Sequence, residues 1–169
     1  MLEIIRLREQ IKLEEKWLFD DNPSDTVENV LEKIVYLLNR TLQEFNGMAS
    51  EMRFKSFGGN STADSSELNT YINQLNKLMV KIKTMIKPIE DKHGLDNEIY
   101  ELSNTVDSSN AYMNSVKEND PNISVLKDHY DTLCTKVKNV GSLLHEAKLP
   151  TPEIKDRNGE ILIAKSDGI

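Results

Sequence analysis

The sequence predicts an all-α protein, with long heptad-patterned helices that form an antiparallel helical bundle or an elongated coiled coil. Apolar residues recur at alternating spacings of four and three along most of the 169-residue chain, which places them on one stripe of an α-helix. The chain has only seven glycines and five prolines, so few residues interrupt helices. Hydrophobic residues make up 38% of the chain, a share that suits narrow apolar stripes better than a thick core.

The first two predicted helices cover about residues 2–19 and 25–53. The segment 20–24 separates them, because Pro23 disfavours helical geometry at the residue before it and has no amide proton. We expect the second helix to organise the chain and to touch more than one neighbour, because its stripe is wider than a two-stranded seam. Its seam residues are Val27, Leu31, Ile34, Leu38, Phe45, Met48 and Met52.

A third helix is predicted over about residues 66–93, after a loop that contains Gly58 and Gly59. Pro88 is expected to kink or end this helix, and Gly94 follows as a stop signal. Its seam is the cleanest in the chain, since no polar residue interrupts it. The seam residues are Leu68, Ile72, Leu75, Met79, Ile82, Ile86 and Ile89.

Two more helices are predicted over about residues 95–117 and 121–148. The first has Ser109 where an apolar seam residue is missing, and its other faces are rich in residues with modest helix propensity. The second starts with a clear signal, because Asp120 can cap it and Pro121 suits its first turn. Its seam residues are Leu126, Tyr130, Leu133, Val137, Val140, Leu144 and Ala147.

The last twenty residues, 150–169, differ from the helical domain predicted over 1–149. Pro150 and Pro152 favour an extended link, and the pair Asn158–Gly159 favours a tight turn before a short apolar run of strand type. The sequence therefore predicts a tail that is extended or forms a β-hairpin. Such a tail could add a strand to the sheet edge of a partner.

Charge and cysteine content exclude several classes of protein. The net charge of −7 argues against binding to nucleic acid or to an anionic membrane, because both need a clustered positive excess. A single cysteine cannot form an internal disulfide. Charged residues occupy the first turns, and no apolar run approaches the length of a membrane span. We therefore expect an intracellular protein, cytoplasmic or nuclear.

Residues with catalytic or metal-binding chemistry are scattered in the sequence. Glu90 and His93 form one Glu-x-x-His motif, whereas a helical di-metal site needs two. Cys134 follows the seam residue Leu133 and is expected to be a partly buried structural thiol. Gly58 and Gly59 lack the Lys and Ser or Thr of a phosphate-binding loop. The sequence thus predicts no catalytic residue, no cofactor and no metal ligand.

These observations favour a non-enzymatic scaffold or adaptor subunit of a multi-protein complex, which packs its helices against partner chains. The partners would be other helical proteins, in a hetero-complex or a homo-oligomer. The alternative is a self-contained bundle that binds a small ligand or a metal in its core. The pattern is shared by many unrelated proteins and so predicts no family. The interface candidates are Trp17, Phe19, Leu31, Leu38, Phe54, Phe57, Leu75, Ile82, Leu133, Val140, Ile161 and Ile163.

Overall fold

The computed structural model describes residues 16–20, 24–55, 65–89, 95–116 and 123–168, with the backbone alone for residues 52–55. This part of the chain is mostly helical, as the sequence predicted, and ends in a two-stranded hairpin. Residues 16–19 are helical; the rest of the predicted helix 2–19 lies outside the described residues. The longer elements are α2 (Val27–Lys55), α3 (Ser66–Lys83), α4 (Leu95–Ser115), α5 (Ile123–Glu146), β1 (Ile154–Lys155) and β2 (Ile161–Ile163).

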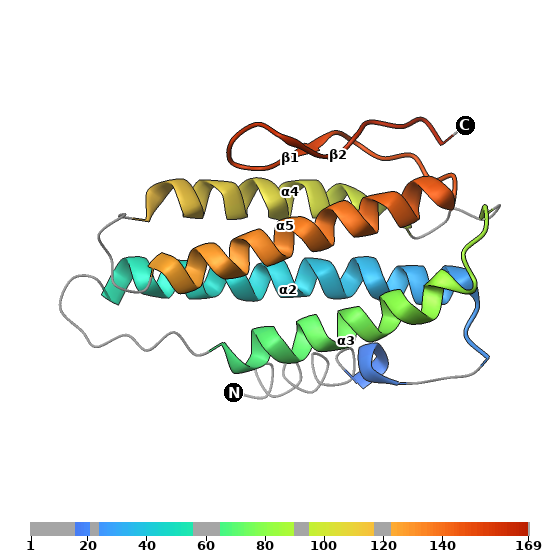
Figure 1. The fold of residues 1–169 in the computed structure, drawn as a ribbon, viewed down its shortest axis with the longest axis horizontal. Coiled ribbons are helices and arrows are strands. Elements are labelled where there is room, and N and C mark those ends of the chain that lie inside the picture. The colour runs from blue at the N-terminus through green and yellow to red at the C-terminus, as the bar shows by residue number, and fades with distance from the viewer. Residues whose placement is uncertain (1–15, 21–23, 56–64, 90–94, 117–122, 169) are drawn as a thin grey trace, which may run out of the picture.

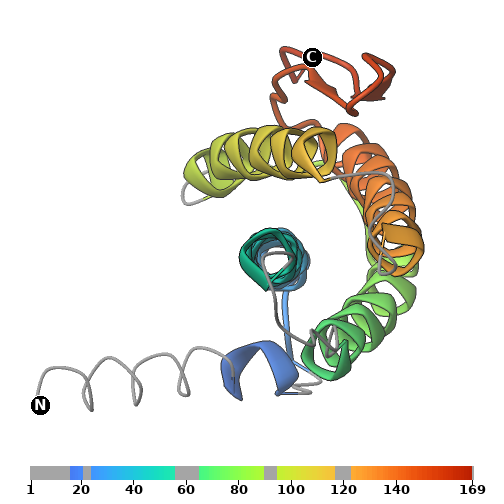
Figure 2. The ribbon, with the colours of Figure 1, turned by 90° about the vertical axis from the view of Figure 1, so that its left-hand side faces the viewer.

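The four long helices lie side by side, and successive helices run in opposite directions (Figure 1). Seen along their axes, α3, α5 and α4 form an arc around α2 (Figure 2). Helix α2 contacts all three of the others. The expectation that the second helix organises the rest is therefore met by a central helix with neighbours on three sides.

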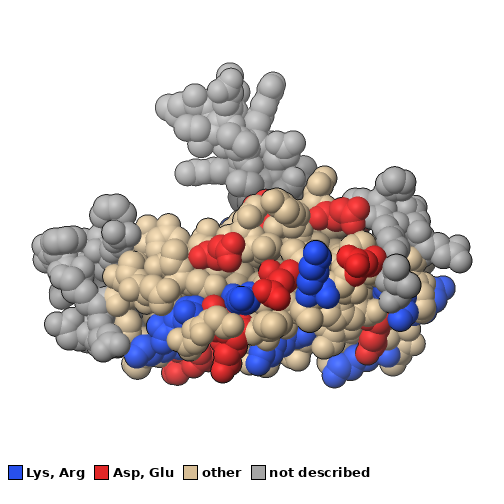
Figure 3. Space-filling view, turned by 90° about the horizontal axis from the view of Figure 1, so that it is seen from above, with Lys and Arg blue, Asp and Glu red and all other residues tan. Residues whose placement is uncertain are grey.

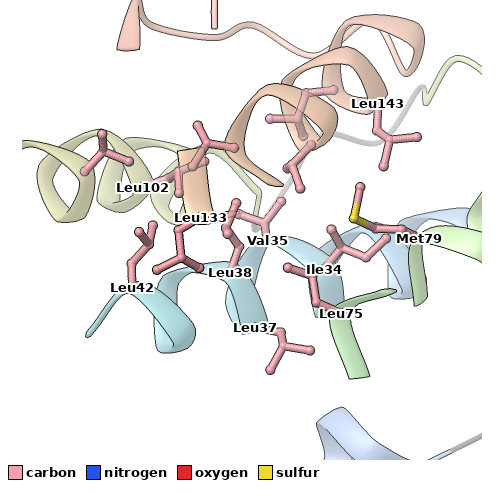
Figure 4. Close-up of a cluster of buried hydrophobic side chains, with 14 of the residues drawn as sticks. Ile34, Val35, Leu37, Leu38, Leu42, Leu75, Met79, Leu102, Leu133 and Leu143 are labelled. Atoms are coloured by element: carbon pink, nitrogen blue, oxygen red, sulfur yellow. The ribbon is translucent and has the colours of Figure 1, made fainter. Parts of the chain in front are cut away.

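Helix α2 can occupy this central position because apolar residues cover most of its circumference. Val30, Leu31, Ile34, Val35 and Leu38 are all fully buried. Side chains from the other helices meet them in one continuous core (Figure 4). Burial of each such side chain contributes about 1.5–3 kcal/mol. Apolar contacts with α2 therefore provide most of the stability of the arc of helices.

Helix α3 ends at Lys83, ten residues before the predicted end of this helix at 93. A turn follows, in which the N–H groups of Met85 and Ile86 both bond to the carbonyl of Ile82. Ile89 is buried, and its N–H donates to the carbonyl of Ala147 at 3.0 Å. The tertiary bond to the end of α5, together with Pro88, replaces the last predicted turns of helix. Residues 90–93 lie outside the described part.

The C-terminal tail forms a hairpin that packs on α4 and α5. Strands β1 and β2 pair antiparallel, and Gly159 takes a positive φ of 83° in the turn, as the Asn-Gly signal predicted. The carboxylate of Asp156 accepts bonds from the N–H groups of Asn158 and Glu160. The hairpin thus covers the outer side of the bundle and contributes Ile154, Leu162 and Ile163 to the core.

A search of the described helices for possible membrane spans finds none that combines the necessary length with enough apolar character.

Candidate functional site

Six of the interface candidates lie inside the core of this chain. None is more than 1% exposed, and each packs against other helices of the same molecule. Their apolar character is thus accounted for by packing within the chain, and their predicted interface role stays a prediction. These six are Leu31, Leu38, Leu75, Ile82, Leu133 and Val140.

The aromatic candidates near the N-terminus are partly covered. Trp17 packs edge-on against Tyr36, with ring centroids 6.2 Å apart. Phe19 is 40% exposed and lies beside the ring of Tyr71. The side chains of Phe54 and Phe57 are outside the described residues, so their predicted interface role stays a prediction.

The two candidates on the hairpin point in different directions. Ile163 is 2% exposed and packs on α5 beside Gly141. Ile161 is 52% exposed and is available to a partner. The face of the molecule that carries the hairpin shows acidic and basic side chains interspersed (Figure 3), and this mixture does not single it out as an electrostatic docking surface.

A pocket of about 250 Å³ lies between α2 and α4. Its residues come from one face of each helix, at spacings of three and four that bring side chains into line. Three of them, Gln43, Asn97 and Glu101, are exposed to solvent, so the pocket opens at the edge of the bundle. The lining residues are Tyr36, Asn39, Arg40, Gln43, Asn97, Glu98 and Glu101.

Two hydrogen-bond acceptors of this pocket have no donor. Asn39 is only 5% exposed, and its Nδ2 donates to the backbone carbonyl of Glu98 at 2.9 Å. Its Oδ1 is buried without a partner among the described residues, and so is Oε2 of Glu98. A buried acceptor left without a donor costs about 1–3 kcal/mol, which marks these oxygens as places where a ligand's donor would be stabilising.

The charge around the pocket is negative. Glu98 and Glu101 line it, and Glu32 stands one helical turn from Tyr36 on α2. Desolvation raises the pKa of Glu32, and the charge of Glu98 raises it further. The guanidinium of Arg40 pairs with Glu44 at 3.5 Å and lies over the ring of Tyr71 on α3. The pocket therefore contains two carboxylates, from Glu98 and Glu101, and one guanidinium, from Arg40, which contacts Tyr71 of α3.

The residues with catalytic or metal-binding potential serve other purposes in the described part. Burial raises the pKa of the Cys134 thiol, which lowers its reactivity as a thiolate. His129 bonds to Oγ of Ser65, and His145 to Oγ1 of Thr151, both at 2.9 Å. Three or more His, Cys, Asp or Glu side chains placed to hold a metal are not found together within the described ranges. His93 lies outside those ranges.

Comparisons of the chain with protein-family models, with curated proteins and with solved structures give no match. The geometry of the pocket is therefore the basis for a functional proposal. Sequence reasoning missed this pocket because its polar residues look like an ordinary solvated face. One signal was present: Asn39 follows the buried residues Leu37 and Leu38 and is itself buried, so a polar side chain sits where α2 is covered.

Proposed function

We propose that the protein is a non-enzymatic scaffold or adaptor subunit, a helical domain that recognises a partner protein at the pocket between α2 and α4. One observation carries the proposal: the two buried acceptors, Asn39 Oδ1 and Glu98 Oε2, find no donor in the described part of the chain and belong to residues that line the pocket. A partner that supplies donors would relieve the cost of leaving them unpaired.

The chemistry of the lining favours binding over catalysis. Among the described residues that line it, the titratable side chains are those of Tyr36, Arg40, Glu98 and Glu101, and neither a histidine nor a thiol is among them. The pocket also opens at the edge of the bundle. It is placed for a side chain of a partner protein, whereas the alternative function expected from the sequence would enclose a ligand in the core.

Site-specific photo-crosslinking tests the proposal. The full chain carries a photoreactive benzoylphenylalanine in place of Gln43, which is exposed and lines the pocket. The matched control carries it in place of Asn139, an exposed residue of α5 that does not line the pocket. Crosslinking is carried out in the cells from which the sequence comes.

We expect the Gln43 position to give a discrete crosslinked partner that the Asn139 position does not give. The substitution Glu98→Lys, which brings a like charge to any donor cation, should abolish that product while the circular dichroism spectrum stays helical. A pattern of products that is the same at both positions, or that Glu98→Lys leaves unchanged, would contradict the proposal.

A further inference from the structure

The pocket between α2 and α4 has the chemistry of a site for one particular side chain. We propose that it receives an arginine side chain of the partner protein, whose guanidinium donates to Oδ1 of Asn39 and to the carboxylate of Glu98. This inference rests on the proposed function and deepens it, because it names the group that the partner must present.

The unmet groups of the pocket are all acceptors. The amide nitrogen of Asn39 is committed to the carbonyl of Glu98, so its oxygen is the atom left for a ligand. Oε2 of Glu98 is the second such atom. A group that fits both must carry at least two donors, and it should carry no acceptor of its own.

The surrounding charge selects a cation. Glu98 and Glu101 line the pocket, and Glu32 is close enough to Glu98 for their charges to interact unfavourably. A positive ligand turns this repulsion into attraction on both sides. Hydrogen bonds between a cation and carboxylates are roughly twice as strong as those between neutral groups.

Arg40 does not fill this role itself. Its guanidinium is 3.5 Å from the carboxylate of Glu44 on the same helix and 5.3 Å from the ring centre of Tyr71 on α3. Lys33, the next cation along α2, is buried against Asp25 and the carbonyl of Asp20. These contacts thus tie Arg40 to Glu44 and Tyr71, and Lys33 to Asp25 and Asp20.

Arginine fits the pocket better than lysine does. The guanidinium is planar and offers five N–H donors in a fork that can reach two separate acceptors at once. It is weakly hydrated and packs on aromatic rings, and Tyr36 lines the pocket. Both orphan oxygens are covered by neighbouring atoms, so the proposal requires the side chains around Asn39 Oδ1 and Glu98 Oε2 to shift as the guanidinium enters.

Titration of the isotope-labelled full chain with N-acetyl-arginine methylamide, followed by backbone amide NMR, tests the inference. The matched probe is the citrulline derivative, which has nearly the same shape and no charge, and the lysine derivative separates a guanidinium from an ammonium. We expect saturable shifts at Asn39, Glu98 and Tyr36 with the arginine probe. The affinity should be at least about tenfold weaker for citrulline, with lysine in between.

A variant series adds a second readout. Glu98→Gln keeps the shape of the side chain and should weaken the arginine probe by about tenfold. The control is Glu153→Gln on the hairpin, an exposed carboxylate that pairs with Lys155 and should leave binding unchanged. Circular dichroism confirms that both variants are folded.

Several results would overturn the inference. One is the absence of saturable shifts up to about 50 mM probe, which spans the range in which one side chain binds. Equal shifts with citrulline, or an unchanged affinity in Glu98→Gln, would overturn it too.

The crosslinking experiment distinguishes a failure of this inference from a failure of the proposed function. If the Gln43 crosslink is nonetheless formed, the proposed function stands and only the arginine is wrong. If no crosslink forms and the probe still binds, the site is a cation site and the adaptor proposal fails.

Discussion

Lys33 of α2 contacts the short segment 16–20, which precedes this helix in the chain. Its ammonium is 2% exposed and donates to Oδ2 of Asp25 at 3.1 Å and to the carbonyl of Asp20 at 3.2 Å. It also lies 5.6 Å from the ring centre of Trp17. The bond to the Asp20 carbonyl and the contact with Trp17 hold residues 16–20 against α2, while Asp25 compensates the buried charge.

The same ion pair bears on the residue that caps α2. Ser24 and Asp25 are both capping residue types, but the carboxylate of Asp25 is taken by Lys33 and by Lys81 of α3. Thr26 caps the helix, since its Oγ1 accepts from the N–H of Asn29 at 3.2 Å. Sequence reasoning could place the helix start within two residues, whereas the choice of cap depended on charges distant in sequence.

At the same scale, Glu32 should make stability depend on pH. Desolvation and the charge of Glu98 raise its pKa above 4.5 in the folded state, so the folded state binds the proton more tightly than the unfolded state. Its contribution is therefore complete below pH 4.5 and is lost as the pH rises through the raised value. We expect Glu32→Gln to gain stability relative to the wild type between pH 4 and pH 7, measured by chemical denaturation.

The background Glu98→Gln provides the control for this pH effect. With the neighbouring charge removed, one of the two causes of the raised pKa is gone, and the gain from Glu32→Gln should shrink. A difference between Glu32→Gln and wild type that is the same at both pH values would show that Glu32 titrates alike in the folded and unfolded states.

At the scale of elements, the hairpin is positioned by a glycine on α5. A Cβ on Gly141 would lie 2.6 Å from Cγ1 and 3.1 Å from Cδ1 of Ile163, which is closer than side chains can approach. We expect Gly141→Ala to push β2 off the helix and to lower the free energy of unfolding by about 1–3 kcal/mol. Chemical denaturation measures the loss.

Two further variants separate this steric effect from helix propensity. Gly47→Ala lies in α2, where the new methyl group meets nothing within 4 Å apart from the adjacent backbone of its own helix, and it should stabilise the protein by about 0.5–1 kcal/mol. Ile163→Ala should cost less stability in the Gly141→Ala background than in the wild type, because it also removes the clash. Equal effects of alanine at the two glycines would mean that the hairpin does not pack closely on α5.

Heptad spacing was enough to predict the helices α2, α4 and α5 to within about two residues at each end, even though Ser109 interrupts the apolar seam of α4. It failed at α3, since a bond between Ile89 and Ala147 cannot be read from local pattern. The pocket was missed for a related reason. Asn39 and Glu98 are 59 positions apart in sequence, and a missing donor becomes visible only when both helices are in place.

At the scale of the whole molecule, the question is whether the apolar seams pack against one another within one chain or against partner chains. The narrow stripes suggested an elongated subunit that completes its core with partner chains. The structure instead wraps α3, α4 and α5 around α2 (Figure 2), and seam residues from all four helices share one core. Under the proposed function, partner binding uses surface features such as the pocket, whereas the seams stabilise the fold.

The substitutions Leu75→Asp and Ile82→Asp, made together in α3, separate these two roles. Both side chains are fully buried, so the variant would bury two unpaired carboxylates, each at a cost of several kcal/mol. Such a loss approaches the whole stability of a domain. We expect the helical circular dichroism signal and cooperative unfolding to be lost.

Val80→Asp is the control on the same helix. Val80 is 67% exposed, so this variant should unfold like the wild type. A double variant that stays helical and monomeric while losing its crosslinked partner would instead make the α3 seam the interface.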